Sequence, residues 1–388
     1  MTGRIALLTF HRRVDYGSYW QTRCLLAGLA RRGHAAVVAD HASDHVRRAE
    51  LACALAPLGD GPAARADVPD KVARIRAFRR AVAELPLSKR VDIARPETAA
   101  RADVPDKVAR IRAFRRAVAE LPLSKRFDIA RPETMEPADL ALFGGDEIWN
   151  PHHPWYGGAP LFFGGGVPAR RYVAYAAGAG GHDATLGFDA DRSARLGAFA
   201  DVSVRDDNTR RLCRDATGRE PEIVLDPCLQ FPPPHEAPDA EGPPCIVVYG
   251  HGFPRWFADA VVAFARRRAL PIVGVGHRSA VADEQRLAAG PEEFRRLMAS
   301  AAAVVTNVFH GCVFALAFGR PFVAAASPAR RDDLRDLVAL VGAQHHVVDE
   351  TRAATVDTVL SAPADAVVRR RIEALRARSD AFLDRVLG

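Results

Sequence analysis

Short apolar runs alternate with stretches of helical periodicity over most of this 388-residue chain. The first example is an apolar run at 4–10, a helical stretch at about 20–32 and a second apolar run at 35–39. Alternation of this kind places the strands in a parallel sheet with the helices on its faces. The same pattern predicts further strands at 140–143, 171–176, 202–204, 223–225, 245–249, 272–275, 303–306 and 321–325, and helices at 257–268, 291–299 and 313–318.

A segment rich in proline and acidic residues, at about 231–244, separates two such blocks and has no apolar period. The chain therefore predicts an α/β fold with two Rossmann-like domains that face a cleft. The opening strand–helix–strand unit lacks the Gly-x-Gly-x-x-Gly motif, so it does not indicate a dinucleotide. We expect an N-terminal domain at 1–231, a linker at 232–244, a C-terminal domain at 245–362 and a closing helix at 363–388 that returns to the first domain.

A stretch of 36 residues occurs twice in succession, at 63–98 and 99–134, and differs only in Val91 against Phe127. Each copy starts with Asp-Val-Pro-Asp and continues as an amphipathic helix. Helical repeat arrays need about three copies to bury a core, so two copies indicate a recent tandem duplication or an error in the gene sequence. A second binding helix is the functional alternative. We expect one copy to form an added surface helix.

The charge and cysteine content exclude several classes of function. The formal net charge is +7, and the few lysines all lie in the duplicated segment, which argues against Schiff-base chemistry. A mild positive balance suits an anionic small-molecule substrate, and no basic stripe interleaved with aromatic residues indicates nucleic acid. The six cysteines lack the spacing of metal ligands, so we expect reduced thiols and no metal site.

The hydropathy of the chain predicts a cytoplasmic protein. No apolar run reaches the roughly 18–20 residues that a membrane span requires, and the N-terminal residues do not resemble a signal peptide. The oligomeric state is left open by the sequence.

In open parallel sheets, ligands bind beyond the carboxyl ends of the strands. This rule directs attention to the loops that follow the predicted strands, at 11–19, 144–150, 205–208, 250–255, 276–279 and 307–312.

Several of these loops belong to a series of eight short motifs. They are Asp-Tyr-Gly-Ser-Tyr-Trp-Gln at 15–21, Gly-Gly-Asp-Glu-Ile-Trp-Asn at 144–150, Val-Ala-Tyr-Ala-Ala-Gly at 173–178, Ser-Val-Arg-Asp at 203–206, Leu-Asp-Pro at 225–227, Glu-Phe at 293–294, Val-Thr-Asn-Val-Phe-His-Gly at 305–311 and Gly-Arg-Pro-Phe at 319–322. In this order and spacing they resemble the polysaccharide pyruvyl transferase family, over about residues 4–345.

The resemblance implies a GT-B-like architecture and an enzyme that moves a pyruvyl group from phosphoenolpyruvate to hydroxyls of a sugar-containing acceptor, without a cofactor. The N-terminal domain would hold the acceptor and the C-terminal domain the phosphoenolpyruvate. The duplication has no counterpart in the family, and the second copy leads directly into the next strand as in the family, so we interpret the first copy as the insertion. The chain also departs from the family at Asp15, Trp20, Gly145 and Val308, where the family has Asn, Leu, Ser, and Ser or Arg, and at Asp206-Asp207, where a Glu-containing pair is usual. Most of these positions lie in the N-terminal loops and therefore bear on the identity of the acceptor.

Three residues are the candidates for catalysis. Arg205 follows a short strand, where its guanidinium suits a carboxylate or phosphate through paired hydrogen bonds. His310 follows a buried strand and precedes a helix, where it could move protons near neutrality or hold phosphate. Asp146 ends a buried strand with Glu147 beside it, and either carboxylate could serve as general base or simply cap a helix and form an ion pair.

The candidates for substrate binding have structural alternatives. Trp149 could stack on a sugar or pack in the core, and Ser18 could cap the first helix. Asp226, before a proline, indicates a structural turn. The full binding set is Tyr16, Gly17, Ser18, Gln21, Glu147, Trp149, His251, His277, Asn307, Gly311 and Arg331.

Three other functions remain open at this stage. A diverged enzyme on the same scaffold could act on a small metabolite or peptide. A GT-B-type glycosyltransferase would use a nucleotide sugar, although no base-and-ribose or pyrophosphate motif is evident. A binding protein could keep the fold without catalysis, since a fold alone does not fix a function.

Overall fold

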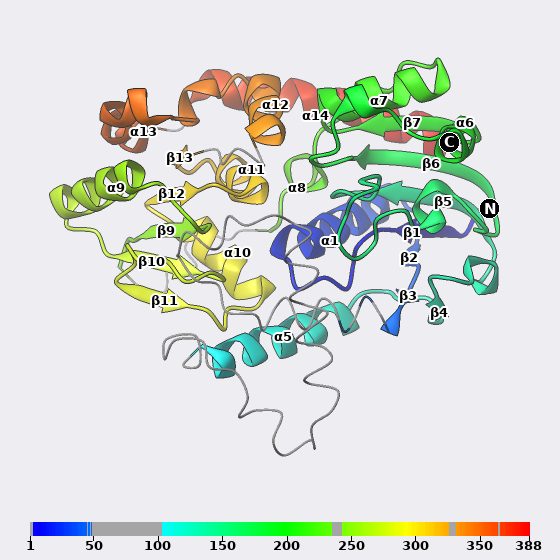
Figure 1. The fold of residues 1–388 in the computed structure, drawn as a ribbon, viewed down its shortest axis with the longest axis horizontal. Coiled ribbons are helices and arrows are strands. Elements are labelled where there is room, and N and C mark those ends of the chain that lie inside the picture. Colours follow the sequence, from blue (N-terminus) through cyan, green and yellow to red (C-terminus); the bar gives the residue numbers. More distant parts are fainter. Residues whose placement is uncertain are drawn as a thin grey trace.

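The elements of the chain gather around two parallel sheets, one from each half of the sequence (Figure 1). The computed structural model describes residues 3–44, 46, 48, 103–234, 243–325, 331–363 and 365–388. The predicted α/β fold of two Rossmann-like domains is confirmed by these sheets. The central part of the linker and the first copy of the duplicated segment, 63–98, lie outside the described residues, so the interpretation of that copy as an insertion stays a prediction.

The N-terminal sheet has six strands in the order β2-β1-β5-β6-β7-β8, and every paired strand is parallel to its neighbour. Its strands are β1 Ile5–Leu8, β2 Ala36–Val38, β5 Ala138–Gly144, β6 Ala169–Ala177, β7 Asp201–Val204 and β8 Glu222–Ile223. Its helices are α1 Tyr16–Arg31, α6 Ala190–Gly197, α7 Asp207–Thr217 and α8 Pro227–Gln230.

The C-terminal sheet has five parallel strands in the order β11-β10-β9-β12-β13. Its strands are β9 Ile246–Tyr249, β10 Ile272–Val275, β11 Glu284–Arg286, β12 Ala303–Thr306 and β13 Phe322–Ala324. Its helices are α9 Arg255–Arg268, α10 Pro291–Ser300, α11 Phe309–Ala317, α12 Arg331–Val341 and α13 Val356–Ser361.

Two helices begin one turn earlier than the periodicity predicts, and this changes the setting of the candidate residues. Helix α1 begins at Tyr16, because the Asp15 side chain accepts a hydrogen bond from the Ser18 amide at 2.8 Å and so caps the helix. Helix α11 begins at Phe309 rather than near 313. The segment 16–18 and His310 therefore lie in first helical turns, not in loops.

The two halves share one continuous core. The ring of Tyr16 in α1 stacks on Phe294 in α10 with 4.1 Å between the ring centroids, and its hydroxyl donates to the Ala289 carbonyl at 2.7 Å. The Trp20 indole donates to the Pro291 carbonyl at 3.0 Å. Buried residues of both sheets belong to the same hydrophobic cluster. Helix α1 thus fixes the N-terminal half on the C-terminal half.

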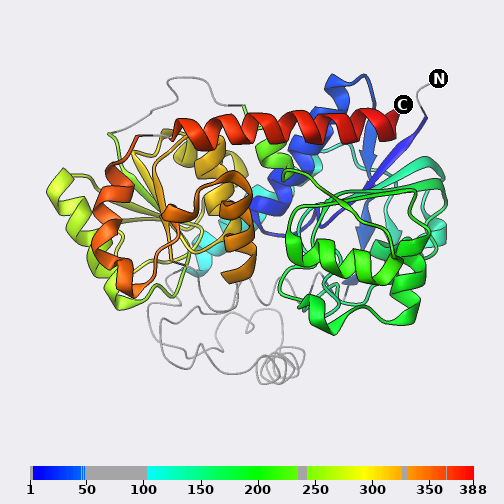
Figure 2. The ribbon, with the colours of Figure 1, turned by 90° about the horizontal axis from the view of Figure 1, so that it is seen from above.

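Helix α14, Ala366–Leu387, runs back along both halves of the molecule (Figure 2). Its Ser379 hydroxyl accepts a hydrogen bond from the Leu225 amide at 2.9 Å, and its Asp384 accepts one from Arg32 at 2.9 Å. Two parallel sheets joined by a returning C-terminal helix form the GT-B-like architecture that the resemblance implies. Among the described residues, no helix combines the length and the apolar character needed to cross a bilayer.

The second copy of the duplicated segment contributes α5, Val104–Ala119, which packs beneath the junction of the two halves (Figure 1). Its Phe114 contacts the ring of Tyr16 at 5.1 Å between centroids, and its Arg110 donates to the Gly276 carbonyl. Farther along this copy, β4 Phe127–Asp128 pairs with β3 His41–Ala42 in a small parallel sheet. The second copy is therefore part of the core. The expectation of an added surface helix then falls on the first copy, which lies outside the described residues.

Candidate functional site

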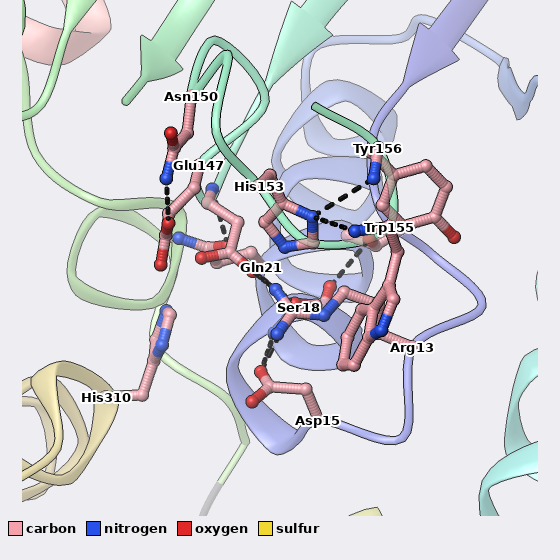
Figure 3. Close-up of polar contacts among 12 residues, drawn as sticks. Arg13, Asp15, Ser18, Gln21, Glu147, Asn150, His153, Trp155, Tyr156 and His310 are labelled. Atoms are coloured by element: carbon pink, nitrogen blue, oxygen red, sulfur yellow. Dashed lines mark hydrogen bonds and ion pairs between the residues drawn. The ribbon is translucent and has the colours of Figure 1, made fainter. Parts of the chain in front are cut away.

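Four ionisable side chains meet where the N-termini of α1, α8 and α11 approach the ends of β5 and β7. They are Asp146, Arg205, Asp226 and His310, hereafter the buried charge cluster, and each is at most 7 % exposed. Burial of this much charge is unfavourable unless the groups compensate one another or a ligand does. In Figure 3, His310 reaches toward this region from α11, while Gln21 and Glu147 extend toward it from the N-terminal half.

Asp226 lies between Arg205 and His310. Its Oδ2 is 3.6 Å from Arg205 Nη1 and 3.7 Å from His310 Nε2, and it accepts a hydrogen bond from Gln21. Within the described residues, neither of those two nitrogens has a hydrogen-bond partner, although both are buried. Burial opposes ionisation of Asp226, but His310 and then Arg205 hold the pKa of its carboxyl below the ordinary value. The two nitrogens are thus donors that an anionic ligand could satisfy.

Asp146 follows β5 in a left-handed backbone conformation, with φ of 41°. Its Oδ2 accepts hydrogen bonds from Arg13 at 2.7 Å and from the Ser18 hydroxyl at 2.5 Å, and its amide donates to Gln21 Oε1 at 3.0 Å. Burial alone would raise the pKa of Asp146, but Arg13, then Arg205 and His310, lower it well below the usual range. A carboxylate stabilised in this way is a weak base, so the geometry favours a counter-charge over a general base.

His310 lies directly on α1. A Cβ added to Gly17 would overlap the imidazole ring, so only glycine allows this approach. Gly311 meets a similar constraint, because a Cβ there would overlap the Thr306 side chain at the end of β12. Both glycines belong to the predicted binding set. The structure gives them a steric role that sets the position of the histidine.

Arg205 follows β7, and its guanidinium contacts an aromatic ring and two carboxylates. Its guanidinium lies over the Phe309 ring with 4.4 Å from Cζ to the centroid, and its Nη2 is 3.9 Å from Asp146. Burial works against the charge, yet Asp146 and Asp226 raise the pKa of Arg205 above its ordinary value. A Cβ on Gly178 would lie 3.1 Å from Arg205 Nε and 2.6 Å from the Asp146 carbonyl oxygen, so this glycine lets the two loops close together.

Glu147 and Trp149 follow Asp146 but have different surroundings. Glu147 is half-buried, and its carboxylate accepts a hydrogen bond from the Asn150 amide at 2.8 Å (Figure 3). Trp149 is fully buried, and its indole donates to the Phe162 carbonyl at 2.9 Å. Trp149 is therefore a core residue, the alternative that the sequence left open, whereas Glu147 keeps a partly exposed carboxylate beside the cluster.

The remaining predicted residues do not join the cluster. Tyr16 is engaged between the two halves through its ring and its hydroxyl. Asn307 donates to the His251 carbonyl at 2.6 Å, and the His251 and His277 rings lie 5.2 Å apart at the ends of β9 and β10. The side chain of Arg331 lies outside the described residues.

Sequence reasoning missed two residues of the site. Arg13 lies in the loop after β1 and forms an ion pair with Asp146 at 2.7 Å. Asp226 indicated a turn, because proline follows it. The turn is real: Asp226 caps α8 by accepting from the Cys228 amide at 2.9 Å. Its second carboxylate oxygen carries the contacts that no local pattern reveals.

A hollow of about 630 Å³ opens beside the loop that carries Arg13. Arg12 and Arg126 line it, and Arg12 forms two hydrogen bonds, of 2.6 and 2.7 Å, with Asp40. Phe114 and Tyr156 supply aromatic surface. Over the described ranges, no group of three or more His, Cys, Asp or Glu side chains is arranged to hold a metal ion. The hollow therefore combines arginines with aromatic walls, a lining suited to a polar ligand.

Comparison with solved structures finds many α/β proteins of low similarity. A variant of the O-GlcNAc transferase of Thermobaculum terrenum is 14 % identical with a TM-score of 0.41, over 99 % of this chain and 66 % of that one. UDP-GlcNAc 2-epimerase from Neisseria meningitidis is 7 % identical with a TM-score of 0.44, over 98 % and 99 %. MnaA of S. aureus, solved with UDP, is 9 % identical with a TM-score of 0.45, over 98 % and 97 %. Scores this low carry no argument about function.

Comparison of the sequence with family models is decisive. No curated protein matches the chain. The model of the polysaccharide pyruvyl transferase family, however, matches residues 15–327, a range that contains all four residues of the buried charge cluster. The chain belongs to the polysaccharide pyruvyl transferase family.

Proposed function

We propose that this protein transfers a pyruvyl group from phosphoenolpyruvate to hydroxyls of a sugar-containing acceptor and forms a ketal. The observation that carries the proposal is the pair of buried donor nitrogens, Arg205 Nη1 and His310 Nε2, which form no hydrogen bond in the described part of the chain and face the Asp226 carboxylate at 3.6 and 3.7 Å. A trianionic donor would supply the acceptor atoms that these groups lack. The adjacent N-terminus of α11 would add favourable backbone dipoles, because no side chain caps it.

The residues suggest a division of roles. Arg205 would hold the carboxylate or phosphate of the donor. His310, as imidazolium, would give a proton to the methylene carbon, and the enol carbon would become an oxocarbenium ion that an acceptor hydroxyl attacks. The hydroxyl proton returns to the imidazole. Phosphate then leaves with the electron pair of its bond to carbon, the second hydroxyl closes the ketal, and its proton goes to the phosphate.

The two neighbouring carboxylates, Asp146 and Glu147, would have different roles. Asp146 is neutralised by Arg13 and would keep the cations in place during the reaction. Glu147 accepts a hydrogen bond from the Asn150 side chain and is half-buried, so it is the better candidate to orient an acceptor hydroxyl. The scheme needs neither a metal nor a redox cofactor.

We place the acceptor in the hollow beside the loop of Arg12 and Arg13. Arginines and aromatic rings are groups that bind sugars through polar contacts and stacking. The hollow adjoins the loop whose Arg13 pairs with Asp146, which would bring acceptor hydroxyls toward the cluster. A cytoplasmic location would give access to both substrates.

The test is ligand-dependent thermal stabilisation, with phosphoenolpyruvate against UDP- and GDP-sugars. At a concentration of 100 times its dissociation constant, a ligand adds about 2.7 kcal/mol of stability. We expect phosphoenolpyruvate to stabilise the wild type and not Arg205→Ala, with Arg195→Ala as a control on the exposed helix α6. Stabilisation by a nucleotide sugar alone would refute pyruvyl transfer and favour a glycosyltransferase.

A further inference from the structure

A histidine outside the buried charge cluster has one ring nitrogen fixed by the backbone. His153 lies in the turn that follows β5, and its Nδ1 accepts hydrogen bonds from the Trp155 amide at 3.3 Å and the Tyr156 amide at 3.2 Å. A backbone amide can only donate, so Nδ1 carries no proton. Burial, and then the charge of Arg13, lower the pKa of this imidazole to about 3. Near neutral pH the ring is therefore uncharged, with its proton on Nε2.

The second nitrogen of the ring is available to a ligand. Within the described residues, His153 Nε2 forms no hydrogen bond, and it is not enclosed by protein atoms as Arg205 Nη1 is. In Figure 3 it lies on the side of the ring away from the turn amides, toward Gln21. The ring interacts with the charges of Arg13 and Asp146. The structure thus presents a neutral hydrogen-bond donor of fixed orientation beside the buried charge cluster.

Trp155 supplies aromatic surface next to this donor. Its side chain is half-buried, and its ring centroid lies 5.5 Å from that of His153. The Arg13 guanidinium lies over the Trp155 ring, with 5.2 Å from Cζ to the centroid. Tyr156, the next residue, lines the hollow in which we placed the acceptor. An aromatic ring with part of its surface exposed, beside a polar donor, suits a ligand with both an apolar face and hydroxyl groups.

Backbone hydrogen bonds close the turn that carries both side chains. The His153 amide donates to the Asn150 carbonyl at 3.1 Å, and the Gly157 amide donates to the His153 carbonyl at 2.8 Å. A Cβ on Gly157 would lie 2.5 Å from that carbonyl oxygen, so the turn closes this tightly only with glycine. Groups that are ordered before binding lose little conformational freedom when a ligand arrives.

We propose that the turn 153–156 receives a sugar ring of the acceptor, with Trp155 packed on the face of the sugar and His153 Nε2 donating a hydrogen bond to one of its oxygens. The inference rests on the proposed function and places the acceptor between the hollow and the buried charge cluster. A neutral donor suits a hydroxyl or ring oxygen and supplies no charge to an acidic group. The sugar at this position is therefore a neutral one. Trp155 takes the stacking role that the sequence offered to Trp149.

Two variants test the two contacts. In His153→Asn the side-chain oxygen can accept from the amide two residues on, as in an Asx turn, but no donor remains at the position of Nε2. Trp155→Leu removes the aromatic surface. The matched control is His152→Asn, at the exposed neighbouring histidine. With methyl glycosides of glucose, galactose and mannose as acceptors, we expect KM for the acceptor to rise about 3- to 10-fold in each test variant, with kcat unchanged. Stabilisation by phosphoenolpyruvate should stay the same, and His152→Asn should match the wild type.

A binding measurement without phosphoenolpyruvate separates this inference from the proposed function. In protein labelled with ¹⁵N-tryptophan, the Trp155 indole signal is identified by its loss in Trp155→Leu. We expect the glycosides to shift this signal and leave that of Trp256 in place, with a weaker affinity in His153→Asn.

An unshifted Trp155 signal with all three glycosides would overturn the proposal, and equal affinity in His153→Asn and the wild type would refute the hydrogen bond. If the glycosides bind at Trp155 and no ketal forms with phosphoenolpyruvate, the proposed function fails and the sugar site stands. If the ketal forms with an unchanged KM in both test variants, the sugar site fails and the proposed function stands.

Discussion

The duplicated segment allows a comparison of two deletions that yield almost the same protein. Removal of 63–98 or of 99–134 leaves a single copy between Pro62 and Met135, and the two products differ only in Phe or Val at the position of Phe127. Phe127 is 5 % exposed, and the strand that it begins pairs with β3. Valine has four fewer side-chain carbons. At about 0.8 kcal/mol for each buried carbon, and with collapse of the space that removes the additional cavity cost, the Val product should be less stable by about 3 kcal/mol.

Urea denaturation of both products and of the full chain measures this difference. We expect the product without 63–98 to unfold at the same midpoint as the full chain, because the described core uses residues of the second copy only. The product with Val should have a lower midpoint with an unchanged dependence on urea. Equal midpoints for the two products would refute the role given to Phe127. Failure of the first product to fold would refute the interpretation of 63–98 as an insertion.

Two further predictions concern the pH dependence of stability and the packing of the site. Burial lowers the pKa of His41 and of His153 to about 3, so both are neutral in the folded state, whereas the unfolded chain binds protons near pH 6.5. The unfolded state thus binds more protons between these pH values. The free energy of unfolding should therefore fall on acidification from about pH 6.5, by about 1.4 kcal/mol per pH unit for each histidine. Urea denaturation at several pH values should show a smaller dependence on pH in His41→Gln, and an equal dependence would contradict this reasoning. Gly17→Ala should displace His310 and abolish pyruvyl transfer while the fold persists by circular dichroism, whereas Gly197→Ala, at a helical glycine with open space, should keep full activity.

Strands with continuous apolar side chains were predictable because burial on both faces leaves a clear signal. β9, with Ile-Val-Val-Tyr, and β12, with Ala-Val-Val-Thr, follow the sequence-based bounds closely. β11, with Glu-Gln-Arg, was missed, because it lies at the edge of its sheet and none of its side chains is fully buried. Its pairing comes from the backbone hydrogen bonds that β10 offers, which side-chain hydropathy does not encode.

The candidate site also contains residues that the sequence identifies and residues that it does not. His310, Arg205 and Asp146 were identifiable because each follows a predicted strand, and the topology brings such positions together. The hydrophobic periodicity did not predict the first turns of α1 and α11, because 16–18 and 309–311 combine glycine and polar residues with aromatic ones. Asp226 was missed for a different reason. Its contacts join residues from α1, the loop after β7 and α11, and no local pattern carries information about such distant partners.

The site depends on contact between the two halves of the protein. His310 belongs to the C-terminal half, whereas Gly17, Gln21, Arg205 and Asp226 belong to the N-terminal half. Helix α1 carries two of these residues and also carries Tyr16 and Trp20, whose hydrogen bonds hold it to the C-terminal half. A shift of α1 would therefore move the interface and the cluster together. Because the same helix packs the domains and contacts His310, the aromatic contacts of Tyr16, although remote from the charges, control the geometry on which the proposed proton transfer depends.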